Sequence, residues 1–261
     1  MREKEKKKRH PVTLIIFLIA LAVMIFSLVK LVGIRKDYQE SEQTFQTLES
    51  KYVVNPDGGT GAIWQDGTRI QFQALQKENA DIRAWLRFDN YDDVHISYPI
   101  LYSGDDETYL RSDIYGNYHI AGCIFLEGLN IPDFSDYHSI VYGHNMRNTT
   151  MFGDLKRYKN DEGFYENNQY FNIYTEDKVL RYQIFSYYDV DENDEVYTVG
   201  YGPDDAWQSL IDRMVSSSMK DTGIHPTKDQ KIVTLSTCSK AGENKRFVVH
   251  GVLVNENLIN E

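Results

Sequence analysis

The spacing of apolar and polar residues divides the chain into an apolar N-terminal segment and a longer body of short strands. Val12 to Val29 is an uncharged apolar run, VTLIIFLIALAVMIFSLV, and Leu31-Val32-Gly33 follow after Lys30. A helix that crosses a bilayer needs about 20 mostly apolar residues, and a lysine at its end can reach the interface. We therefore expect a single transmembrane anchor over residues 12–33.

The residues on either side of this segment predict its orientation. Residues 1–11 are strongly basic, and a positively charged flank stays in the cytoplasm. A cleaved secretory signal is the alternative, but its apolar region is usually shorter and no small-x-small cleavage pattern follows here. We expect a cytoplasmic tail over 1–11, a polar stalk or linker over 34–62 and an extracellular domain over 63–261.

The body alternates between short apolar runs and turn signals. From Val94 onward about eight such runs are separated by Gly, Asp, Asn and Pro: VHISYPILY, HIAGCIFLE, SIVYGH, NIYTE, VLRYQIFSYYDV, EVYTVGY, KIVTLSTC and RFVVHGVLV. Many short strands with few helices are typical of a closed or nearly closed barrel. The fold is therefore predicted to be mainly β, an eight-stranded barrel.

Three segments show helical spacing instead. Asp37 to Lys51 is polar and compatible with a helix, and Phe72 to Leu86 places its apolar residues at helix-like intervals, although Asn79-Ala80-Asp81 can break it in two. Asp204 to Lys220 has one apolar face and begins with the start signals Pro203-Asp204. This last helix is expected immediately before the strand KIVTLSTC.

The two last runs bring a thiol and a guanidinium together. Strand alternation places Ser236 and Cys238 on one face of KIVTLSTC, and Arg246 opens the next strand. The polar residues 239–245 between them suit a hairpin connection. If the strands pair antiparallel, Cys238 and Arg246 lie at the same end of the sheet, as a nucleophile beside an anion-stabilising group would.

Charge and cysteine content exclude several classes of function. The net charge is −11; residues 1–36 hold nine Lys and Arg against two Glu, so the rest of the chain carries −18. A body this acidic repels phosphates, and we expect no nucleic-acid partner. Cys123 and Cys238 form no CxxC pair and no Cys/His cluster, so we expect no metal site and no cofactor.

A catalytic cysteine needs a base or another cation nearby, because the free thiol is mostly protonated at neutral pH. Among the seven histidines, His144 follows the run Ile140-Val141-Tyr142-Gly143, so it is expected at a strand end, as Cys238 and Arg246 are. His250 is the rival, because it shares a strand face with Arg246, but it lies four residues into that strand.

Each of these residues also has a structural interpretation. Cys238 can form a disulfide with Cys123, which an exported domain would tolerate, although Cys123 is more typical of a small buried apolar residue. Arg246 can be a solvated charge at the start of a strand. The run Asp189 to Gly200 opens like a calcium loop, but it lacks the glycine and the glutamate that such a loop requires and is expected to be a solvated acidic loop.

Taken together, several segments resemble the sortases, and class B among them most closely. The resemblance runs from about Phe72 to Val254 and includes Arg246, the arginine that opens the last strand. It rests on these segments in this order: Ser97-Tyr98-Pro99-Ile100, Gly122-Cys123-Ile124-Phe125-Leu126, Tyr142-Gly143-His144-Asn145-Met146, Met151-Phe152-Gly153-Asp154-Leu155 and Thr234-Leu235-Ser236-Thr237-Cys238. It implies a sortase-type barrel on the outer face of a Gram-positive bacterium, with a helix inserted before the cysteine strand.

The resemblance also implies roles for these residues. Cys238 would attack the threonine carbonyl in the C-terminal sorting signal of a secreted protein and form a thioester. His144 would protonate the departing amine and deprotonate the incoming one, and Arg246 would orient the substrate and stabilise the oxyanion. Ser236 would contact the substrate. The implied partners are secreted proteins with a sorting signal and an amine of the peptidoglycan or its precursor.

Three other functions stay open from the sequence. A hydrolytic cysteine peptidase would release its thioester to water, and a pilin-polymerising sortase would use a pilin lysine as the acceptor. A surface-binding barrel domain without catalysis is the third. It explains less, because a binding module has no need of Cys238, His144 and Arg246 together.

Overall fold

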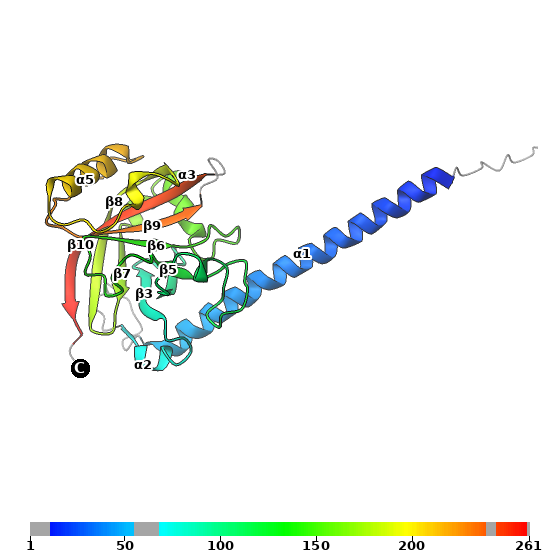
Figure 1. Cartoon of the computed structure of the whole chain (residues 1–261), viewed down its shortest axis with the longest axis horizontal. Coiled ribbons are helices and arrows are strands. Elements are labelled where there is room, and N and C mark those ends of the chain that lie inside the picture. The colour runs from blue at the N-terminus through cyan, green and yellow to red at the C-terminus, as the bar shows by residue number, and fades with distance from the viewer. Residues whose placement is uncertain (1–10, 55–67, 239–243, 260–261) are drawn as a thin grey trace, which may run out of the picture. The chain divides into compact units, whose positions relative to one another are not determined.

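Eight strands close into a barrel in the computed structural model, which describes residues 11–54, 68–238 and 244–259 (Figure 1). The order around the barrel is β10-β8-β7-β3-β4-β5-β6-β9. The pairs β4–β5 and β6–β9 are parallel, and the other neighbours are antiparallel. The barrel strands are β3 Ile82–Phe88, β4 Ser97–Leu101, β5 Ile124–Leu126, β6 His138–Tyr142, β7 Tyr170–Tyr174, β8 Lys178–Asp191, β9 Ile232–Cys238 and β10 Lys245–Leu258.

Short elements connect these strands. They are β1 Val53–Val54, β2 Arg69–Ile70, α2 Phe72–Leu75, η1 Thr108–Leu110, η2 Gly153–Lys156, α3 Arg157–Asn160, α4 Phe164–Asn167 and η3 Glu195–Tyr197. Strands β1 and β2 form a separate two-stranded antiparallel sheet. None of these elements exceeds four residues, so the barrel strands carry most of the buried core.

The prediction of eight strands is confirmed, but one barrel strand was missed and one predicted strand was wrong. Residues 82–88 form β3 and not the second half of a helix over 72–86, of which only α2 is helical. Strand β3 lies between β4 and β7 and is buried on both faces, so its apolar residues follow no period of two. The run EVYTVGY, in contrast, is no strand, because the Asp194 side chain accepts the Val196 N–H at 2.9 Å and starts the turn η3.

The helix expected before the cysteine strand is present as α5, Asp205–Ser217. Asp204 is its N-cap, and the carboxylate accepts the N–H of Trp207 at 2.9 Å. The buried face of α5 packs on residues of β8, β9 and β10, and Figure 1 shows the helix beside these strands. That face consists of Trp207, Leu210, Ile211 and Met214.

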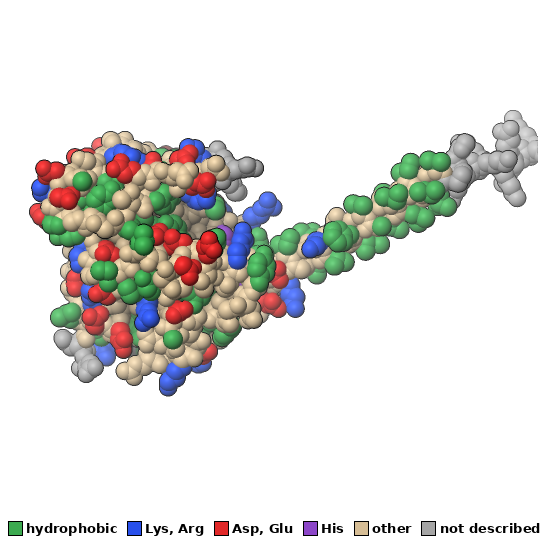
Figure 2. Space-filling model, in the orientation of Figure 1, with side chains coloured by type: hydrophobic (Ala, Val, Ile, Leu, Met, Phe, Trp, Pro, Cys, Tyr) green, Lys and Arg blue, Asp and Glu red, His purple; other side chains and the backbone are tan. Residues whose placement is uncertain are grey.

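The long helix α1, Pro11–Tyr52, belongs to two compact units, which divide between Glu40 and Ser41. In the first unit its apolar side chains are exposed along the helix, as Figure 2 shows. It is the one described helix that is long and apolar enough to cross a membrane, with a mean hydropathy of 3.1 over its most apolar part. The basic residues 1–10 and the turn-rich residues 55–61 lie outside the described residues.

The second unit starts earlier than the sequence suggested. Phe45, Leu48 and Tyr52 of α1 are each at most 5% exposed within this unit. The compact unit thus begins at Ser41, whereas the folded domain was expected near Ile63 after a stalk over 34–62. The mostly polar sequence of residues 41–52 gave little sign of this packing, because a single apolar stripe is enough to dock a helix.

Candidate active site

Cys238 and Arg246 face each other across the β9–β10 pair. The two strands are antiparallel, and the Cα of Arg246 is the register partner of the Cα of Cys238. Val248 lies opposite Ser236, so all four side chains project from one face. The predicted placement of a thiol and a guanidinium at one end of the sheet is confirmed.

The two cysteines are free thiols in different surroundings. Cys238 is exposed, whereas Cys123 is 1% exposed and its Sγ donates to the carbonyl of Ser112 at 3.3 Å. The disulfide between them is therefore absent. Burial raises the pKa of Cys123, so this thiol stays protonated, and Cys238 is the accessible thiol of the two.

His144 reaches the same end of the barrel from a parallel strand. Strand β6 runs parallel to β9, with Tyr142 in register with Ser236, and the N–H of Gly143 donates to the Ser236 carbonyl at 3.1 Å. The chain passes very close to the core at Gly143, where a Cβ would lie 2.4 Å from Ile124 Cδ1. A glycine is required there, and His144 follows it directly, past the strand end as predicted.

The His144 ring is held by a backbone carbonyl. Its Nε2 lies 2.7 Å from the carbonyl oxygen of Leu110, so Nε2 carries the hydrogen and Nδ1 is the unprotonated nitrogen. Burial lowers the pKa of His144, the Leu110 carbonyl opposes this, and the positive charge of Arg111 adds to the lowering. The neutral imidazole is thus favoured near neutral pH, with Nδ1 available to take up a proton.

Asn145 ties the histidine segment to the cysteine strand, and sequence reasoning missed it. Its side-chain Nδ2 donates to the backbone carbonyl of Cys238 at 2.8 Å. The signals in the sequence were the polar run directly after Gly143-His144 and the place of Asn145 in the segment Tyr142-Gly143-His144-Asn145-Met146, which carries the family resemblance. This bond fixes the end of β9 relative to the segment that follows β6.

Arg246 has an ionic partner from the acidic loop. Its Nη2 donates to Glu192 Oε2 at 2.7 Å, and its Nη1 donates to the carbonyl of Lys245 at 3.3 Å. The same loop pairs Asp191 with Lys245, and Asp194 and Glu195 with Arg213. The acidic side chains of the loop that opens like a calcium site therefore form ion pairs with Lys and Arg. In the described part of the chain, no group of three His, Cys, Asp or Glu side chains is placed to hold a metal ion.

One cavity of about 210 Å³ connects these groups. Its lining includes His144, Cys238, Arg246 and the predicted substrate contact Ser236. The buried Ser236 hydroxyl lies 2.9 Å from the hydroxyl of Tyr197, a neighbour that the sequence did not reveal. The remaining lining residues were also missed: Asp106, Leu110, Phe125, Tyr142, Gly143 and Thr237.

Tyr142, which lines this cavity, is hydrogen-bonded to a buried carboxyl group behind it. The Tyr142 hydroxyl donates to Glu127 at 2.6 Å, and the Glu127 side chain is 7% exposed. Burial raises the pKa of Glu127, and the neighbouring Asp106 raises it further. The cavity wall is thus polar on this side and aliphatic at Leu110.

His250, the rival candidate, does not reach this cavity. It is fully buried, and its Nδ1 lies 2.8 Å from Thr234 Oγ1 in the interior of the β9–β10 pair. His144 is therefore the histidine that the fold brings to Cys238 and Arg246.

This geometry agrees with comparisons against known proteins. The family profile of the sortase domain matches residues 91–254. The chain belongs to the sortase family. Its relatives and structural neighbours are sortases of class B, which makes it a class B sortase and a cysteine transpeptidase that acts in cell-wall anchoring. The non-catalytic surface-binding domain is thereby set aside.

The similarity extends over most of the chain. Sortase B of Staphylococcus aureus is 28% identical over 217 residues, which cover 82% of each protein. Sortase B of Listeria monocytogenes is 29% identical over 241 residues, or 92% of this chain and 95% of the relative. The crystal structure of Bacillus anthracis sortase B in complex with AAEK1 has a TM-score of 0.71 at 28% identity and covers 84% of this chain and 99% of that chain. The closed barrel observed here is the sortase B fold.

Proposed function

We propose that this sortase cleaves the C-terminal sorting signal of secreted proteins after a threonine and transfers the protein to an amine of the cell-wall peptidoglycan. The observation that carries the proposal is the shared cavity of Cys238, His144 and Arg246, three side chains from three separate strand ends. A nucleophile, a base and a fixed cation in one cavity are the set that acyl transfer requires.

In the first half-reaction, the Cys238 Sγ attacks the threonine carbonyl carbon. The thiol proton passes to the free Nδ1 of His144, and the guanidinium of Arg246 stabilises the oxyanion of the tetrahedral intermediate. When the intermediate collapses, the C–N bond breaks and Nδ1–H protonates the departing amine. A thioester between Cys238 and the threonine remains.

The second half-reaction runs in the reverse sense with another amine. His144, neutral again, removes a proton from the incoming amine as its nitrogen attacks the thioester carbonyl. The C–S bond then breaks, a new amide forms, and the departing Cys238 thiolate takes the proton from His144, which restores the thiol and the neutral imidazole. Ser236, on the cysteine strand and in the same cavity, is proposed to contact the sorting signal.

The membrane arrangement is part of this proposal. The exposed apolar helix over 12–33 would anchor the protein, with residues 1–11 in the cytoplasm and the barrel outside the cell. Protease treatment of intact cells tests it: the barrel should be degraded without lysis, and protection of the barrel would contradict the orientation.

Mass spectrometry of the full-length protein in detergent micelles tests the reaction. Incubation with a panel of sorting-signal peptides should add the mass of the threonyl fragment to Cys238, and added triglycine should remove it as an amide product. The Cys238→Ala variant should show neither. Release only as a free acid, with triglycine present, would favour the hydrolytic peptidase, and transfer only to a pilin lysine would favour pilin polymerisation.

A further inference from the structure

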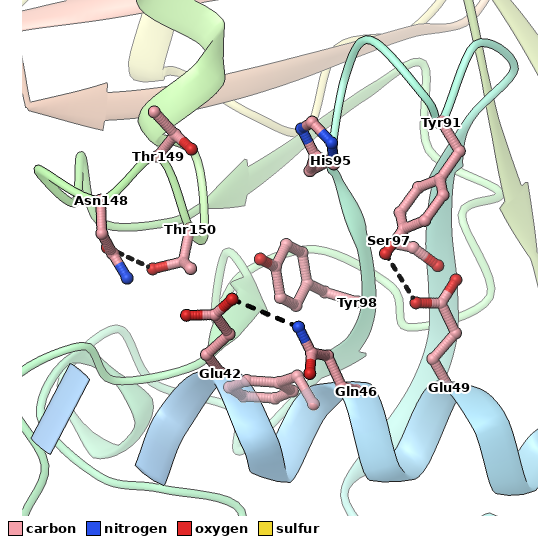
Figure 3. A pocket seen from close by; sticks show the side chains of 11 residues that line it. Glu42, Gln46, Glu49, Tyr91, His95, Ser97, Tyr98, Asn148, Thr149 and Thr150 are labelled. Carbon is pink, nitrogen blue, oxygen red and sulfur yellow. Dashed lines mark hydrogen bonds between the residues drawn. The ribbon is translucent and has the colours of Figure 1, made fainter. Parts of the chain in front are cut away.

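A second cavity, of about 250 Å³, shares no lining residue with the active-site cavity (Figure 3). It has three walls. Helix α1 supplies Glu42, Phe45 and Glu49, strand β4 and the loop before it supply aromatic and hydroxyl side chains, and residues 148–150 close the third side. All of these residues belong to the compact unit that begins at Ser41.

The charges on the walls are negative. Glu42 and Glu49 line the cavity, and no Lys or Arg is among its lining residues. The exposed Glu42 accepts a hydrogen bond from the neutral Gln46 amide at 3.2 Å, and it takes part in no ion pair within the described residues. Glu49 accepts the Tyr91 hydroxyl at 2.9 Å and lies 3.4 Å from Arg87. The charge of Glu49 is thus already paired, and Glu42 is the lining carboxylate that favours a cation in this cavity.

Aromatic and hydroxyl groups complete the lining. Tyr98 lies in the middle of the close-up and packs edge-to-face on Phe45, with ring centroids 5.3 Å apart. The hydroxyls of Thr149 and Thr150 lie on the third wall. Carboxylates and hydroxyl oxygens accept the three N–H bonds of an ammonium group, and aromatic faces attract its charge.

The third wall, residues 148–150, is continuous along the chain with the segment after β6 that bears His144. The Tyr98 hydroxyl accepts the N–H of Met151 at 3.1 Å, and Thr149 and Met151 have φ of 67° and 53°. Positive φ is unfavourable for a threonine, so surrounding contacts must hold this backbone in place. At its other end the segment bears His144 and Asn145, and Asn145 bonds to Cys238.

We propose that this second cavity binds a primary ammonium group, and that its occupant stabilises residues 145–151 in the conformation that presents His144 and Asn145 to the active site. Glu42 is the counter-ion, Glu49, which is paired with Arg87, adds a hydrogen-bond acceptor, and Tyr98 connects the ligand to the Met151 amide. The ammonium can come from a lysine-like side chain of a peptide or from a free alkylamine.

Calorimetric titration of the full-length Cys238→Ala protein in detergent micelles tests the binding. The probes are n-butylammonium and an acetylated, amidated Ala-Lys-Ala peptide. We expect Glu42→Gln to weaken binding of both about fivefold, because one exposed charge pair contributes up to about 1 kcal/mol. The matched Glu162→Gln variant, an exposed charge elsewhere, should change nothing. Tighter binding of the peptide than of butylammonium identifies a peptide source, and equal binding a free amine.

Two results would overturn the site. One is unchanged binding in both Glu42→Gln and Glu49→Gln, with thermal melting used to confirm that the second variant folds. The other is loss of binding only in Asp106→Asn, which would place the amine in the active-site cavity. Because the probe protein lacks the thiol, the outcome does not depend on the proposed reaction.

Amide hydrogen exchange tests the connection to the active-site segment. Butylammonium should slow exchange of the Met151 amide, whose N–H donates to the Tyr98 hydroxyl. In Tyr98→Phe, which lacks that acceptor, the amine should still bind but the slowing should disappear. Exchange at Met151 that is unaffected by bound amine in the parent protein would refute the connection.

Discussion

The open end of the β9–β10 pair and its interior each carry a cross-strand pair of side chains on one face, yet the two places have different chemistry. At the end, Cys238 is in register with Arg246; four residues further in, Thr234 is in register with His250. The first pair lines a cavity, and the second is fully buried. Burial therefore separates an accessible pair from an enclosed one on the same face of the sheet.

The interior pair belongs to a hydrogen-bonded chain whose polarity the structure defines. His138 Nδ1 lies 3.0 Å from the Thr198 carbonyl, so Nδ1 donates and Nε2 accepts from the Thr234 hydroxyl at 2.8 Å. Thr234 in turn accepts from His250 Nδ1 at 2.8 Å. Both rings are neutral in this arrangement and have no route to substrate. His144, in contrast, lines the cavity at the end of the sheet, where its unprotonated Nδ1 can meet substrate.

Removal of His144 should have the largest effect on the reaction. We expect His144→Ala to slow transfer by about 10³-fold, because general acid–base catalysis contributes roughly 10²–10⁴. Steady-state transfer of a sorting-signal peptide to triglycine measures this. Cys238 should still react with iodoacetamide, which controls for folding. Unchanged transfer would point to another base and would weaken the distinction between the two histidines.

Acid should destabilise the interior rather than the open end. Burial lowers the pKa of His138 from 6.5 to about 4 and lowers that of His250 further below its usual value. In the unfolded chain the two histidines bind protons near pH 6.5, whereas in the folded chain they do so only at a much lower pH. The stability that their neutral forms allow above pH 6.5 is therefore lost as the pH falls. For His138 alone the loss approaches about 3 kcal/mol by pH 4.

Urea unfolding between pH 7.5 and 4, followed by tryptophan fluorescence, measures this loss. Carboxylates also contribute to acid unfolding, so the comparison with His138→Gln is the control. In that variant the unfolding free energy should depend less steeply on pH, because unfolding takes up as much as one proton fewer. An identical slope in both proteins would mean that His138 does not stay neutral in the fold.

Substitution of the arginine at the open end should have a smaller effect than loss of His144. Arg246→Lys keeps the charge but loses the planar, two-armed donor geometry, so we expect transfer to fall by about 10- to 100-fold with an unchanged melting temperature. Transfer kinetics at saturating peptide measure the change. Near-normal turnover would show that charge alone suffices at this position.

The ion pair behind Arg246 should have the smallest effect. Arg246 and Glu192 are both about one-third exposed, and such pairs contribute roughly 0.2–1 kcal/mol. Glu192→Gln should therefore reduce transfer about two- to fivefold. Asp191→Asn is the matched control, because Asp191 pairs with the neighbouring Lys245 and should leave transfer unchanged. Equal effects of the two substitutions would argue against a specific role for Glu192.

Local patterns predicted much of this molecule. Alternation in KIVTLSTC and RFVVHGVLV was enough to place Cys238 and Arg246 at one end of the sheet, and Asp204 marked the start of α5. These predictions succeeded because they depend on neighbours within a few residues. The predictions for residues 82–88 and 195–201 were wrong for the opposite reason. In residues 82–88, burial on both faces removed the alternation typical of a strand, and in residues 195–201 a side-chain cap overrode it.

The sequence alone determined the apolar N-terminal segment, the strand-rich body and the three residues of the candidate site. Only the tertiary structure decided which nitrogen of His144 is free, because that depends on the Leu110 carbonyl 34 residues earlier in the chain. The bond from Asn145 to the Cys238 carbonyl, between residues 93 apart, and the two cavities also required the closed barrel. Contacts at such separations depend on how the strands pack, and no local pattern records them.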